Sequence, residues 1–249
     1  MRSKLGLLAV SWVAVCGAQG GGGAYTARIR QQVVVYGEVA GAMETVVAVR
    51  ADGARARVVR PVNEGVGSEM VERSVELPDG FVGTYYPAAK VQATGYRTRA
   101  MVEAMEKSKL TGESGCTATK ASVVKSLRVA GEERMLGVRV VRVVADTERV
   151  RGTHWMAPEL GCLAVKREMR YLGAGGAVER VMEETALELR LGEPEKGLFE
   201  RPEGYEEVEP SEADVRMAKA LGRACPECEK ARGGNKDQLY RSLQRARQF

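Results

Sequence analysis

The stretch GEERMLGVRVVRVVADTERVRGTHWMAPELGCLAVKREMRY, residues 131–171, decides the fold of this chain. It contains three runs rich in β-branched and other apolar residues, at 138–145, 150–157 and 162–171. A polar turn at Asp146 and Thr147 separates the first two runs, and a turn from Pro158 to Gly161 separates the last two. Connections this short join neighbouring antiparallel strands. The stretch therefore predicts three consecutive strands of an antiparallel sheet.

Two further hairpins are predicted on the N-terminal side of this stretch. The Asp-Gly pairs at 52–53 and 79–80 each join two alternating runs, and Asp-Gly supplies the positive φ angles of a tight hairpin turn. Strand-like alternation also begins at Tyr25, recurs in a short run at 120–130, and follows the Gly-rich turn at 173–176. We therefore expect a mainly β fold with a few helices, in which residues 25–210 form one antiparallel β domain.

The C-terminal part of the chain has a different composition. Residues 193–214 are rich in acidic residues and proline, which is typical of a closing loop at the end of a domain. Ser211, with Asp214 three residues later, is a helix-start signal. We expect residues 211–249 to form a helical tail with little apolar surface, which is either an appendage or a segment that docks on a partner.

Composition and charge bound the functions open to the chain. With 249 residues and 44% hydrophobic content it can bury one sizeable core. The net charge of +5 comes from Arg and Lys spread along the sequence without a dense basic block, and aromatic residues make up only 5%. Nucleic-acid binding needs a basic patch, with aromatic residues to stack on bases. The sequence therefore predicts no nucleic-acid partner.

The N-terminus predicts export. Arg2 and Lys4 precede the apolar run LGLLAVSWVAV, which is too short to span a bilayer and fits a secretory signal. Small residues at Cys16 and Ala18 predict a signal peptide over 1–18, followed by a flexible leader at 19–24. The expected location is periplasmic or secreted, with no membrane span in the mature chain. A lipoprotein anchored at Cys16 is the minority alternative.

Four cysteines remain if Cys16 leaves with the signal, and four cysteines allow three pairings. The economical pairing joins Cys116, which precedes the central strands, to Cys162, which opens the last of them. Cys225 and Cys228 form a CPEC motif with redox spacing. No strand and crossover helix surround that motif, so a local disulfide or an inactive pair is favoured over a thiol redox role, and over a metal site or an intermolecular link.

No catalytic or metal site is expected. His154 is the only histidine and lies within a predicted strand beside Trp155, so we interpret it as a packing or surface residue of the sheet. Glu183 and Glu184 lie on opposite faces of a strand and do not form an acid-base pair. The Gly runs at 20–23 and 173–176 lack the context of a phosphate-binding loop, so no cofactor is predicted.

Three segments resemble a known group of proteins. They are VAGEERMLGVRVVRV, THWMAPELGCLAVKRE and LRLGEPEKGLFERPEGYEEVEPSE. This pattern is similar to exported bacterial proteins with the LolA-like lipoprotein-carrier fold, most of them uncharacterised, and it covers about residues 116–212. The resemblance implies an incomplete, curved antiparallel sheet, a half-barrel whose concave face is apolar and lidded by helices. In the carriers that concavity shelters acyl chains.

Three functions from different classes follow. The first is an exported, non-enzymatic protein that binds a lipid, a lipoprotein acyl chain or another apolar ligand in the concave face of the sheet. The alternative is an envelope structural or interaction protein with a filled core, a protein partner and no ligand. The third is a thiol redox protein that uses Cys225 and Cys228. None of the three assigns an individual ligand-binding residue.

Overall fold

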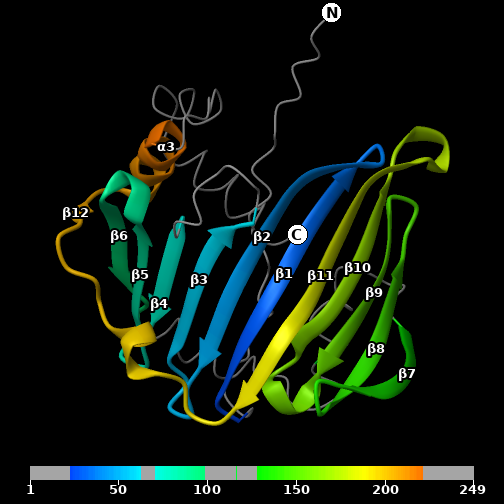
Figure 1. Ribbon diagram of the computed structural model, residues 1–249, viewed down its shortest axis with the longest axis horizontal. Helices are drawn as coiled ribbons and strands as arrows, with labels where there is room; N and C mark the ends of the chain where they lie inside the picture. Colours follow the sequence, from blue (N-terminus) through cyan, green and yellow to red (C-terminus); the bar gives the residue numbers. More distant parts are fainter. Residues whose placement is uncertain (1–22, 63–70, 99–115, 117–127, 221–249) are drawn as a thin grey trace, which may run out of the picture.

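The computed structural model describes residues 23–62, 71–98, 116 and 128–220 (Figure 1). Within these ranges almost all regular structure is β. The strands are β1 (Tyr25–Val35), β2 (Glu38–Val49), β3 (Arg55–Pro61), β4 (Glu72–Glu76), β5 (Phe81–Tyr86), β6 (Val91–Tyr96), β7 (Arg128–Met135), β8 (Val138–Asp146), β9 (Val150–Ala157), β10 (Leu163–Leu172), β11 (Val178–Leu191) and β12 (Glu206–Glu207).

All twelve strands belong to one sheet, in the order β12-β6-β5-β4-β3-β2-β1-β11-β10-β9-β8-β7. Two meanders, β1 to β6 and β7 to β11, are joined because β1 pairs with β11 along its whole length. The short β12 adds to β6 in parallel, and the other pairings are antiparallel. The sheet ends at β12 and β7, which lie at opposite edges (Figure 1), so it stays open rather than closing into a barrel.

The expected fold class is confirmed, and so are the three central strands. Strands β8, β9 and β10 follow the predicted runs, with a short 3-10 helix, η2 (Pro158–Leu160), at the second predicted turn. The hairpins at Gly53 and Gly80 are also present, and both glycines have positive φ. The strand expected at 120–130 differs: the described strand is β7, and residues 120–127 lie outside the described residues. As an edge strand β7 is exposed on both sides, so its sequence shows no clear alternation.

One face of the sheet, called here the inner face, carries the buried residues of β1. Along β1 the odd positions Tyr25, Ala27, Ile29 and Gln31 are buried, whereas Arg28 and Arg30 are exposed. The register carries the same face across to β2 on one side and to β11 on the other. This alternation of buried and exposed residues is that of an antiparallel sheet with one covered face.

The outer face of the central strands is charged. Arg28 lies 3.8 Å from Glu44 and 3.7 Å from Glu188, and Arg30 lies 2.7 Å from Glu44. Such exposed pairs each contribute only about 0–1 kcal/mol. This face is therefore a solvated surface over β1, β2 and β11.

The segment after β11 covers part of the sheet before it reaches the helix that begins at Pro210. A 3-10 helix, η4 (Lys196–Phe199), buries Phe199 against Ala48, Ala54 and Ala56 of the β2–β3 hairpin. Arg73 of β4 donates hydrogen bonds of 2.8 and 2.6 Å to the carbonyls of Gly197 and Glu200. The acidic and proline-rich segment is thus a strap that is fastened to the sheet.

Helix α3 (Pro210–Ala220) is packed on the sheet rather than standing apart from it. Ala213 is fully buried with Tyr86 and Val91 at the β5–β6 end of the sheet. The hydroxyl of Tyr86 and the carboxylate of Asp214 are hydrogen-bonded at 3.1 Å. The helix begins one residue before the predicted Ser211, and residues 221–249 of the expected helical tail lie outside the described residues.

Candidate functional site

A row of buried polar side chains crosses the inner face. His154 of β9 is paired with Arg167 of β10, Arg167 with Glu184 of β11, and Glu184 with Gln31 of β1. Directly paired residues on neighbouring strands share one face of a sheet. Glu184 is 2% exposed and the other three residues are 5% exposed. We call these four residues the polar row.

A hydrogen bond and an ion pair link three members of the polar row. The guanidinium of Arg167 makes an ion pair with Glu184, with 3.0 Å between Nη1 and Oε2. Its Nε donates a hydrogen bond of 3.1 Å to Nδ1 of His154. Nδ1 of His154 is the acceptor in this bond. The ion pair of Arg167 with Glu184 brings one positive and one negative charge into the row.

Apolar residues flank the polar row on both sides. Ile29 lies two residues before Gln31 on β1 and is paired with Ala186 of β11, and both residues are buried. On the other side of the row, Met182 lies two residues before Glu184 on β11. It is paired with Val33 of β1 and with Met169 of β10. Met169 is paired in turn with Gly152, where a Cβ atom would overlap the Met169 sulfur. A glycine is therefore needed there for the thioether to lie against the sheet.

The disulfide lies on the same face. Cys116 and Cys162 are joined, with their Cα atoms 5.3 Å apart, in agreement with the pairing expected from the sequence. Cys116 is buried against Val141, Val143 and Met156, and Val143 is paired with His154 of the polar row. The bond thus holds the chain at Cys116 against the inner face beside the row. Cys16, Cys225 and Cys228 lie outside the described residues.

A second buried polar group lies at the end of the inner face where β1 begins. Tyr25 is fully buried, and its hydroxyl has no hydrogen-bond partner among the described residues. Burial raises the pKa of Tyr25 to about 12, although the Arg55 guanidinium acts in the opposite direction. Burial also lowers the pKa of Arg55, against the effect of Glu76 beside it.

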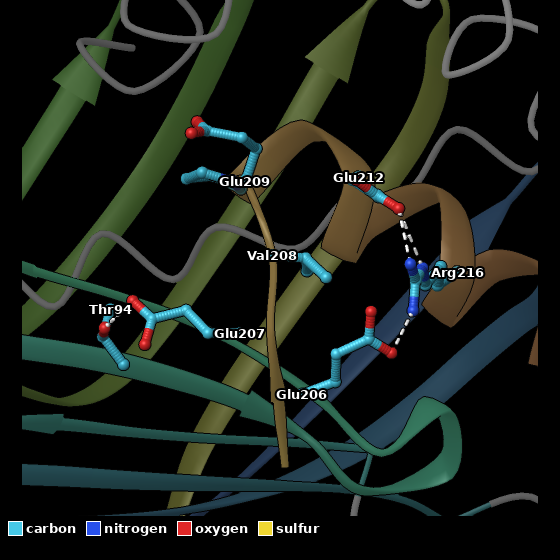
Figure 2. Close-up of a pocket in the computed structure, with 8 residues that line it drawn as sticks. Thr94, Glu206, Glu207, Val208, Glu209, Glu212 and Arg216 are labelled. Carbon is cyan, nitrogen blue, oxygen red and sulfur yellow. Dashed lines mark hydrogen bonds and ion pairs between the residues drawn. The ribbon is translucent and has the colours of Figure 1, made fainter.

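An acidic hollow of about 410 Å³ lies at the β12–α3 end of the molecule. Figure 2 shows how its charges are arranged: Arg216 lies 2.7 Å from Glu206 and 2.6 Å from Glu212. The hydrogen bond from Arg216 holds the pKa of Glu206 below its ordinary value. Within the described ranges no group of three or more His, Cys, Asp or Glu side chains is placed to hold a metal ion. The hollow is an exposed ion-pair network that fastens α3 to β12.

The sequence placed some of these side chains correctly and missed others. His154 lies in a strand and is buried, as interpreted, and Glu183 and Glu184 do lie on opposite faces, exposed and buried respectively. Sequence reasoning did not single out Gln31 or Arg167. A signal was present for Gln31, because it continues the buried alternation of Tyr25, Ala27 and Ile29 with a polar residue.

These features define a class of protein by its architecture: one open antiparallel sheet with a covered inner face. Among similar solved structures, a LolA superfamily protein from Nitrosomonas europaea is 7% identical, with a TM-score of 0.34, and the match covers 74% of this chain and 91% of the other. A putative outer membrane lipoprotein-sorting protein domain from Vibrio parahaemolyticus is 10% identical, with a TM-score of 0.30 and coverages of 73% and 92%.

The structure of the MucA/MucB complex from Pseudomonas aeruginosa is 15% identical, with a TM-score of 0.42, and the match covers 77% of this chain and 59% of that one. The chain therefore spans about three fifths of the length of that structure. No protein-family model and no curated protein sequence matches the chain. None of the helices in the described part of the chain is long and apolar enough to cross a membrane.

Proposed function

We propose that this protein is an exported, non-enzymatic binding protein that holds a lipid, an acyl chain or another apolar ligand against the inner face of its sheet. The observation that supports this most strongly is the set of buried apolar side chains on either side of the polar row, Ile29 and Ala186 on one side and Met182 on the other. Burying apolar area of a ligand against such side chains is favourable by roughly 25 cal/mol per Å².

Two features support the location. The N-terminal run after Arg2 and Lys4 fits a secretory signal. The disulfide between Cys116 and Cys162 is of a kind that persists in oxidising compartments such as the periplasm. We therefore propose that the protein is periplasmic or secreted.

Native mass spectrometry of the full chain, expressed with its own leader and purified from the exported fraction, tests this function. The expected spectrum contains protein bound to a co-purifying apolar ligand. Replacing Met182 by Gln keeps the volume of the side chain but makes it polar, and it should weaken binding of a fluorescent fatty-acyl reporter about tenfold. The matched control is Glu183→Gln, on the exposed face of the same strand, which should bind as the unaltered protein does.

Bare protein that also fails to bind the reporter would contradict the proposal. Equal affinity of the Met182→Gln variant and the unaltered protein would place the ligand elsewhere.

A specific surface favours a second candidate, the interaction protein with a protein partner in the envelope. Tyr36 and Val39, at the β1–β2 turn, are 74% and 60% exposed. Exposed apolar residues at one place can mark a protein-binding surface. Under this alternative, replacing both residues by Ser should abolish partner binding while reporter binding to the inner face stays unchanged.

A further inference from the structure

One oxygen of the Glu184 carboxylate has no hydrogen-bond donor in the described part of the chain. Oε2 is paired with Arg167 at 3.0 Å, whereas Oε1 is buried and unpartnered. Glu184 is only 2% exposed, so its carboxylate is closed off from bulk solvent. A buried acceptor without a donor costs free energy, and the cost is larger for a charged group. This oxygen is therefore the place in the polar row where a partner is missing.

The donors in the polar row are directed elsewhere. Gln31 is paired with Glu184 across the strands, yet its amide nitrogen lies 3.1 Å from the sulfur of Met182. Nε of Arg167 is engaged by Nδ1 of His154 at 3.1 Å. The inner face thus presents a fixed acceptor, held in place by an ion pair and surrounded by apolar side chains.

We infer that Oε1 of Glu184 accepts a hydrogen bond from a hydroxyl or an amide N–H at the polar end of the bound apolar ligand. This inference rests on the proposed function and specifies the ligand's chemistry. The apolar part of the ligand lies along Ile29 and Ala186 or along Met182, on either side of the acceptor.

Charge selects a neutral donor over an ion. A carboxylate or phosphate of the ligand would be repelled by the negative Glu184. Arg167 is not available to bind such an anion, because it is already paired with Oε2 of Glu184. An ammonium would bring a second positive charge beside Arg167 into a buried place, where desolvation opposes it. A hydroxyl or an amide N–H satisfies Oε1 without adding a charge. The ligand class is therefore a neutral amphiphile, such as a monoacylglycerol or a fatty amide.

Competition binding with three matched ligands tests the inference on the delipidated full chain with its disulfide intact. Monooleoylglycerol carries hydroxyl donors, oleamide carries amide N–H donors, and methyl oleate has the same acyl chain and no donor. The unaltered protein should bind at least one of the two donor ligands about tenfold or more tightly than methyl oleate, which is typical of a hydrogen bond to a charged group. Comparing the two donor ligands shows whether hydroxyl or amide is preferred.

Glu184→Gln supplies the second arm, because an amide in place of the carboxylate can turn a donor toward the ligand. The variant should lose the tenfold preference while its affinity for methyl oleate stays within about threefold of the unaltered protein's. Glu183→Gln removes a carboxylate from the opposite, exposed face of β11 and should keep the preference.

The outcomes separate the two proposals. If the three ligands bind the unaltered protein with equal affinity, or if Glu184→Gln keeps the preference, the donor site is wrong and the apolar binding function stands. If none of the ligands binds, both the proposed function and the proposed hydrogen bond to Glu184 are contradicted. The three-ligand comparison uses unaltered protein, so it decides the matter even if Glu184→Gln does not fold.

Discussion

The phenol of Tyr25 makes the stability of the protein depend on alkaline pH. Its folded-state pKa is about 12 against an ordinary value of 10.0, because burial disfavours the charged form. Between these values the unfolded chain releases the proton while the folded chain keeps it, so the free energy of unfolding falls as pH rises. The loss is about 1.4 kcal/mol per pH unit, or about 2.7 kcal/mol in all.

Tyr25→Phe should remove this pH-dependent fall in the free energy of unfolding. At neutral pH the variant should also gain about 1 kcal/mol, since it no longer buries a hydroxyl without a partner. Urea unfolding at pH 7, 10 and 12 measures both effects. Tyr36→Phe is the control, because Tyr36 is 74% exposed, and it should follow the unaltered protein. Parallel pH curves for Tyr25→Phe and the unaltered protein would contradict the assignment.

Single residues were predictable from the sequence where local alternation decides their place. The alternation of β11 is enough to separate Glu183 from Glu184, and the strand pattern around His154 is enough to put it in the sheet. The polar row was not predictable, because it depends on the registers of three strand pairs at once. A one-residue slip in any of them would move Arg167 or Gln31 to another row or face.

The Cys116–Cys162 disulfide should contribute strongly to the stability of the folded protein. It closes a separation of 46 residues, which in the chain-entropy model contributes about 4 kcal/mol. Replacing both cysteines by Ala should therefore lower Tm by about 10 °C. Thermal unfolding with and without reductant measures this. Reductant should lower the Tm of the unaltered protein and leave that of the variant unchanged.

The matched control for the disulfide replaces Cys225 and Cys228 by Ser. Since the Cys116–Cys162 bond is intact in that variant, it should keep the Tm of the unaltered protein. An unchanged Tm in the double Ala variant would show that the bond does not constrain the fold.

Strands that show an apolar run between clear turn residues were predicted from the sequence, and elements without such a pattern were not. The β8, β9 and β10 runs are apolar and end in clear turns, so their bounds follow from the sequence. Strand β7 is an exposed edge and offers no burial pattern. Helix α3 has few large apolar residues, and its attachment depends on Ala213 and Asp214 meeting Tyr86, which is far away in the chain. Such distant contacts leave no periodic trace in the sequence.

The architecture depends on one long-range pairing. Each meander is built from neighbours in sequence, but β1 and β11, which begin at residues 25 and 178, meet in the middle of the sheet. The sequence predicted an antiparallel sheet because hairpin signals repeat along the chain, and its resemblance to the LolA-like carriers implied that the sheet is open. It did not predict that its first and eleventh strands pair, because loop closure over such a distance is set by tertiary packing.

Photo-crosslinking with a monoacylglycerol that carries a diazirine on its acyl chain tests the central claim, that the inner face binds an apolar ligand, most directly. The full chain is irradiated with the probe, and the modified residues are located by tandem mass spectrometry. We expect adducts beside the polar row, at Ile29, Met182 or Met156, and their loss when unlabelled methyl oleate competes. Adducts confined to the outer face or to the β1–β2 turn, or no specific adduct, would contradict the claim.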